Sequence, residues 1–138
     1  MTIHWHEKLS VENDWIDSDH KYLFEQINQV KQGLKTYDRS RLTNLIKDFY
    51  DFLVAHFARE EKIVRVIGND PLLQQLYESH LTLLIRLNQI QKENGEVWKD
   101  SSIEQIGIFL GDLLIHIIKE DLMMKPTLRK YSPSFIPI

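Results

Sequence analysis

The sequence predicts an all-α fold, an up-down-up-down antiparallel four-helix bundle with an N-terminal arm. Apolar residues recur every three to four positions in four stretches of similar length, which is the spacing of one helix face. Clusters of Gly, Pro, Asn and Asp separate these stretches, and short linkers make antiparallel neighbours the simplest arrangement. Because 138 residues is an ordinary size for one domain, we expect a single domain over residues 1–138.

The expected elements follow from apolar spacing and from typical capping and helix-breaking residues. Residues 1–18 are expected to form a docked arm, because Trp5, Leu9 and Trp15 are too apolar for a free tail. Helices are expected over about 19–37, 40–66, 71–93 and 102–129, with an extended tail over 131–138. The expected caps and breakers are Asp17 or Ser18, Asp38-Arg39-Ser40, Gly68-Asn69-Asp70-Pro71, and Ser101 or Ser102.

Composition excludes several classes of protein. A formal charge of -3 leaves no basic footprint for nucleic acid. The chain has no cysteine, which excludes disulfides, thiolate ligands and a cysteine nucleophile. The N-terminus has no apolar signal core, and no run approaches the roughly 20 apolar residues of a membrane span. We therefore expect a cytoplasmic protein without a membrane span.

Histidines and carboxylates interrupt the apolar stripes. On the second stretch, Phe49 and Leu53 lead at helical spacing to His56 and Glu60, so both polar side chains should face the core. An ionised carboxylate is costly to bury alone, so Glu60 should be protonated, paired or bound to a cation. The inward residues that interrupt the four stripes are His20, His56, Glu60, His80, His116 and Asp121.

The antiparallel topology should place these six residues at one level of the bundle. His20 begins the first helix, while the His56–Glu60 and His116–Asp121 pairs lie late in the second and fourth helices. His80 lies at a compatible depth in the third. A single buried histidine is usually just hydrogen-bonded in the core. Four histidines and two carboxylates at one level would be an expensive polar core unless they bind metal.

This ligand set indicates the kind of metal. Imidazoles with carboxylates suit iron, zinc or copper rather than magnesium or calcium. Six side chains are too many for one tetrahedral zinc and are about right for two ions that share Glu60 and Asp121. A ferritin-like di-iron site would need Glu-x-x-His on two helices, and the sequence contains no Glu-x-x-His.

The order of these motifs resembles the hemerythrin family, in particular its single-domain bacterial members, over nearly the whole chain. The motifs are Ile16-Asp17-x-x-His20, His56-Phe57-x-x-Glu60-Glu61, His80, and His116-Ile117-x-x-x-Asp121. The resemblance implies two non-haem iron ions bridged by Glu60, Asp121 and an oxo or hydroxo group, with reversible binding of O2. By the same resemblance, His20 and His56 would hold the iron at which O2 docks, and His80 and His116 would hold the other.

One residue departs from the family pattern. The third helix of the family normally carries His-x-x-x-His, whereas Leu76 stands one turn before His80. The second iron would then lack a usual ligand. Water or hydroxide could fill that position, Tyr77 or Glu78 could reach it after a local distortion, or the metal could bind weakly.

The resemblance implies an O2-binding protein used for storage, delivery or sensing, with O2 or another small diatomic or peroxide as its ligand. The alternative is a di-iron enzyme. With Leu76 in place of an imidazole, both irons could have exchangeable positions, and such a site would favour oxidase-type or peroxide chemistry.

Overall fold

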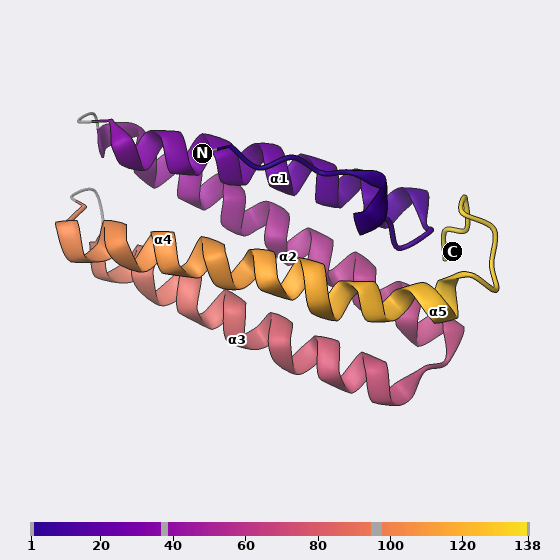
Figure 1. Cartoon of the computed structure of the whole chain (residues 1–138). Helices are drawn as coiled ribbons and strands as arrows, with labels where there is room; N and C mark the ends of the chain where they lie inside the picture. Colours follow the sequence, from indigo (N-terminus) through magenta and orange to yellow (C-terminus); the bar gives the residue numbers. More distant parts are fainter. Residues whose placement is uncertain (1, 37–38, 95–97, 138) are drawn as a thin grey trace.

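A computed structural model describes residues 2–36, 39–94 and 98–137, and it confirms the predicted all-α four-helix bundle (Figure 1). The long helices are α1 (Asp14–Lys35), α2 (Leu42–Ile67), α3 (Asp70–Asn94) and α4 (Asp100–Ile115). Helix α2 packs between α1 and α3, and α4 packs on α3 and closes the bundle against α1. Consecutive helices run antiparallel, as predicted.

The first helix begins earlier than predicted. It starts at Asp14, and the side chain of Asn13 caps it by accepting a hydrogen bond from the backbone N–H of Ile16 at 3.1 Å. The expectation that Asp17 or Ser18 caps this helix was wrong. Asp17 holds the arm instead, because its carboxylate accepts hydrogen bonds from the Ser10 hydroxyl at 2.5 Å and the Val11 N–H at 2.9 Å.

The linkers also differ in detail from the prediction. Helix α2 begins at Leu42, after a 3₁₀ turn over Arg39–Arg41. The predicted end of the first helix at residue 37 and the predicted start of the turn at residue 38 lie outside the described ranges. Helix α4 begins at Asp100 after Lys99, which makes no side-chain cap, so the prediction that Ser101 or Ser102 caps it was wrong. Ser102 is already inside the first turn, where its N–H donates to the Lys99 carbonyl at 3.1 Å.

The predicted fourth helix, 102–129, is one helical path with a change of winding. Helix α4 is followed by a π-helical turn over His116–Glu120, a 3₁₀ turn over Asp121–Met124 and the short helix α5 (Lys125–Leu128). The following tail is not uniformly extended, since the Phe135 N–H donates to the Ser132 carbonyl at 2.9 Å in a turn. The tail lies against the start of α1, where Asn13 donates to the Phe135 carbonyl at 2.9 Å.

A polar layer separates two apolar clusters in the core. The larger cluster contains Leu23, Phe57 and Leu83, and the smaller one contains Ile16, Ile63 and Leu76, all buried. On each of α1, α2 and α3 a residue of the smaller cluster and a residue of the larger cluster flank a buried polar position. These polar positions are His20, Glu60 and His80.

The stretch Asp100–Leu128 is long and apolar enough to cross a membrane by length and composition, contrary to the expectation that no run approaches a span. The same stretch supplies Phe109, Leu113 and His116 to the interior of the bundle. Core helices of soluble proteins pass the same test, so this finding does not show a membrane span.

Gly68 ends α2 in a left-handed conformation with φ of 88°, and its N–H donates to the Val64 carbonyl at 3.0 Å. An added Cβ would meet nothing within 4 Å, so Gly68→Ala should cost about 1–2 kcal/mol through backbone strain alone. Gly107 is a matched control inside α4, where a Cβ also meets open space and alanine should add up to about 1 kcal/mol. Urea unfolding measures both values, and equal effects of the two substitutions would contradict this account.

Candidate metal centre

All six residues predicted from the sequence come together at one level of the bundle. Helix α1 supplies His20, α2 supplies His56 and Glu60, α3 supplies His80, and the path that continues α4 supplies the remaining two. His20, His56, Glu60 and Asp121 are fully buried, while His80 is 1% exposed and His116 is 5% exposed. The small exposure of His80 and His116 shows that the cluster lies closest to solvent on the side of α3 and α4.

The two carboxylates lie between the four imidazoles. Glu60 Oε2 lies 3.3 Å from His20 Nε2, and Glu60 Oε1 lies 3.1 Å from His56 Nε2 and 3.3 Å from His80 Nε2. Asp121 Oδ2 lies 3.0 Å from His20 Nε2, and Asp121 Oδ1 lies 3.1 Å from His116 Nε2. Every imidazole therefore points its Nε2 atom toward a shared carboxylate.

These residues form two overlapping groups, each of which could hold a metal ion. One group is His20, His56, Glu60 and Asp121, and the other is Glu60, His80, His116 and Asp121. Within each group the possible ligand atoms lie within 4.8 Å of one another. Because Glu60 and Asp121 belong to both groups, two ions placed here would share both carboxylates.

The π-helical turn explains how His116 and Asp121 can both face inward. In a regular α-helix, residues five positions apart point in directions about 140° apart, since each residue turns by about 100°. The wider π turn over His116–Glu120 brings positions five apart closer to one face, and both side chains are buried. Such turns inside α-helices often lie at functional sites.

Three further carboxylates hold the outer Nδ1 atoms of the histidines. His56 Nδ1 lies 2.9 Å from Asp19 Oδ2, and His80 Nδ1 lies 2.7 Å from Glu61 Oε2. His116 Nδ1 lies 2.5 Å from Glu120 Oε2. Carboxylates at this position orient an imidazole and strengthen it as a metal ligand.

Sequence reasoning did not assign these outer residues. Arg59 Nε donates to Asp19 Oδ2 at 2.6 Å, and Glu120 holds His116. The available signal was adjacency, because Asp19, Glu61 and Glu120 each stand next to one of the six inward residues.

The atoms that face the centre have no hydrogen-bond partner of good geometry among the described residues, despite their short separations. They are Nε2 of His20, His56, His80 and His116, both carboxylate oxygens of Glu60 and both of Asp121. Buried polar atoms are nearly always satisfied, so eight such atoms converging on one space fit bound cations.

The carboxylates change the pKa values of the buried histidines. Burial lowers the pKa of His20, but the close carboxylates of Asp121 and Glu60 outweigh it and raise the pKa to about 10. Burial also lowers the pKa of His80, while the close carboxylates of Glu60 and Glu61 raise it to about 9. Burial raises the pKa of Glu60, yet the charge of His56 and the close Nε2 of His20 bring it well below its usual range.

Leu76 is fully buried one turn before His80, as predicted, and it packs in the smaller apolar cluster with Ile63 and Met124. Tyr77 is 50% exposed, and Glu78 accepts a hydrogen bond from Gln74 at 2.8 Å on the solvent side of α3. Helix α3 is regular through this region, so the structure brings neither Tyr77 nor Glu78 to the cluster.

The fold and the site define a four-helix metal-binding domain with two overlapping His-carboxylate groups. The family model described as the hemerythrin HHE cation binding domain matches residues 11–132, and the chain belongs to the hemerythrin family. A bacteriohemerythrin of Pseudomonas aeruginosa is 23% identical over 117 residues, which cover 85% of this chain and 75% of that protein. A bacteriohemerythrin of Stenotrophomonas maltophilia is 27% identical over 64 residues, which cover 46% of this chain and 42% of that protein.

The raised histidine pKa values predict how the stability of the metal-free protein depends on pH. The folded values for His20 and His80, about 10 and about 9, exceed the value of 6.5 for a free side chain. Proton binding therefore stabilises the fold fully below about pH 6.5, and this contribution is lost as pH rises through 9 to 10. The melting temperature of metal-free protein should therefore fall between pH 6.5 and about pH 10.

Metal-loaded protein provides the control for this measurement. Bound metal requires neutral imidazoles, so loaded protein should not show the same alkaline loss and should instead release metal at acid pH. Identical melting profiles of loaded and metal-free protein between pH 6.5 and 10 would contradict the assignment of these pKa shifts to the cluster.

Proposed function

We propose that this protein is a non-haem di-iron protein that binds O2 for storage, delivery or sensing. The observation that carries the proposal is the convergence of four buried imidazoles on two fully buried carboxylates that belong to both metal-binding groups. Membership of the hemerythrin family supports iron as the metal and O2 as the ligand. The names of the bacterial relatives support the same assignment.

In this proposal each group holds one iron. His20 and His56 would hold the first ion, His80 and His116 would hold the second, and both ions would share Glu60 and Asp121. The ions would supply the electrons for reversible O2 binding and would displace the protons of the imidazoles, while the protein orients the ligands and shields them from water. Asp19, Glu61 and Glu120 orient three of the imidazoles through Nδ1 and fix the tautomer that leaves Nε2 free for metal.

Metal content of the purified protein tests the proposal directly. Protein loaded anaerobically with Fe(II) should hold close to two irons per chain, because two groups of four ligand residues are available. Glu60→Ala and Asp121→Ala should each lose both irons, whereas His20→Ala should mainly weaken one. His6→Ala is a matched control, since His6 is exposed and lies outside the cluster.

Elemental analysis and the optical spectrum before and after O2 give the result. Folded protein that takes up no iron would end the proposal, and one iron per chain would mean that one of the two groups does not hold metal. A Glu60→Ala variant with two irons and an unchanged spectrum would show that Glu60 does not bridge.

The ligand count also supports a second candidate, an enzyme with oxidase-type or peroxide reactivity. Each group contains only two imidazoles besides the shared carboxylates. Leu76 occupies the place at which the resemblance expects a third imidazole for the second iron, and its surroundings are apolar. Exchangeable positions on both ions would favour irreversible oxidation over clean reversible binding. The O2 complex of the unaltered protein would then decay quickly to the ferric state.

Leu76→His tests the role of this position. Leu76 and His80 are buried one turn apart on α3, so an imidazole at position 76 can point toward the same ion. We expect slower autoxidation and slower iron loss to a chelator in the variant. In metal-free protein the same substitution should cost about 1–3 kcal/mol, because it buries an imidazole in an apolar cluster without a partner.

The combination of these measurements separates ligation from packing. A variant that is destabilised without metal and recovers its stability with iron has gained a ligand. A variant equally destabilised with and without iron, with unchanged autoxidation, would show that residue 76 does not reach the metal. Leu83→His on the same helix, in the larger cluster beyond His80, is the matched control.

A further inference from the structure

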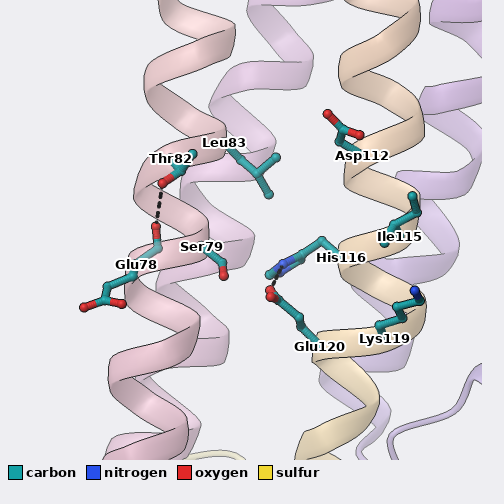
Figure 2. Close-up of a pocket in the computed structure, with 9 residues that line it drawn as sticks. All are labelled: Glu78, Ser79, Thr82, Leu83, Asp112, Ile115, His116, Lys119 and Glu120. Atoms are coloured by element: carbon teal, nitrogen blue, oxygen red, sulfur yellow. Dashed lines mark hydrogen bonds and ion pairs between the residues drawn. The ribbon is translucent and has the colours of Figure 1, made fainter.

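A pocket of about 430 Å³ between α3 and α4 reaches His116, one of the six residues of the candidate metal centre (Figure 2). Its lining residues come from both helices and from the π-helical turn. They are Glu78, Ser79, Thr82, Leu83, Asp112, Ile115, His116, Lys119 and Glu120. In Figure 2 the imidazole of His116 extends from its helix toward α3, between the two walls of the pocket.

This pocket lies where the cluster is least covered. His116 is the most exposed of the six cluster residues, and the adjacent His80 is the next, while the other four are fully buried. The His80 and His116 rings are 5.0 Å apart between centroids, so both bound the same side of the cluster. Four other hollows in the described part of the surface are lined by none of the six residues.

The side chains that line the pocket carry more negative than positive charge. The lining contains the carboxylates of Glu78, Asp112 and Glu120 against one ammonium group, that of Lys119. Asp112 forms an ion pair with Arg86 at 2.9 Å, and Glu120 contacts His116. Among the described contacts, the partner of Glu78 is the neutral side-chain amide of Gln74. An acidic lining disfavours the approach of anions and leaves the approach of neutral molecules unaffected.

We propose that the α3–α4 pocket is the entry route by which small neutral ligands such as O2, NO or H2O2 reach the ion held by His80 and His116. This inference rests on the proposed function and adds the side of entry and the ligand class. It also differs from what the family resemblance implies, which is docking at the ion held by His20 and His56. The geometric reason is that His20 and His56 have no exposed surface, whereas His116 lines the pocket.

Filling the pocket tests the route. Ser79→Trp places an indole on the α3 wall beside His80, and Gln89→Trp places the same group in a second hollow between the same two helices, away from the cluster. Stopped-flow measurement of NO binding to the Fe(II)-loaded protein should show association slowed roughly tenfold or more by Ser79→Trp, because close packing elsewhere leaves few other paths. Gln89→Trp should change it by less than about twofold.

Reversing one charge tests the ligand class. Glu78→Lys should speed azide association with the Fe(III)-loaded protein roughly threefold or more at low salt, with the gain shrinking at about 0.5 M salt. NO association should stay within about twofold, because NO carries no charge. Glu93→Lys, in the second hollow on the same helix, is the matched control. Equal gains for azide with both variants would overturn the charge selectivity of the pocket.

A readout without iron keeps this inference separate from the proposed function. In zinc-loaded protein under dissolved O2, paramagnetic relaxation of the Leu83 methyl protons should be strong, and Ser79→Trp should reduce it severalfold while leaving Ile90 in the second hollow unaffected. A chain that binds no iron would end the proposed function, and the Leu83 relaxation would still test whether O2 enters the pocket. If iron content is normal and Ser79→Trp changes neither the NO association rate nor the Leu83 relaxation, the entry route is wrong and the proposed function stands.

Discussion

The burial of Glu60 and Asp121 is the constraint on which the rest of this structure depends. Both carboxylates are fully buried in the middle of the bundle, where an uncompensated charge would cost several kcal/mol. Four imidazoles from four different helical segments approach their oxygens within 3.0–3.3 Å. Because every helix contributes to this layer, the relative depth of the helices is tied to it, and the apolar core divides into a cluster on each side.

The outer carboxylates extend the same design across helix boundaries. Asp19 stands next to His20 on α1 but contacts His56 on α2, and Glu61 stands next to Glu60 on α2 but contacts His80 on α3. A residue adjacent to an inward-facing one points to the flank of its helix, where the neighbouring helix packs. Helices α1 and α2 thereby each supply side chains to the centre and orient the histidine of the next helix, whereas Glu120 holds His116 within the same π-helical turn. Arg59 pairs with Asp19 and offsets its charge at the partly exposed edge.

The asymmetry of the centre comes from its surroundings rather than from its ligands. The two groups contain the same residue types, two imidazoles and the shared carboxylates. On one side, the ring of Phe52 stacks on that of His56 with the centroids 6.3 Å apart, while Phe57 contacts His56, His80 and His116 and so covers both sides. On the other side, His116 lines the pocket between α3 and α4, and Leu76 fills the space one turn before His80 with hydrocarbon. The surrounding side chains therefore decide how the two sides of the centre differ.

Apolar periodicity in the sequence determined the four helices and the six inward polar residues, because a buried stripe must repeat at helical spacing wherever the chain packs. It did not determine the helix ends. Asp17 is a good cap by composition, but the arm takes its carboxylate, and Asn13 serves in its place. The spacing of five between His116 and Asp121 carried a signal of altered winding, yet only the bundle required both to face inward. Likewise, the contacts of Asp19 with His56 and of Glu61 with His80, and the pocket beside His116, exist only where separate helices meet, so the tertiary structure alone decided them.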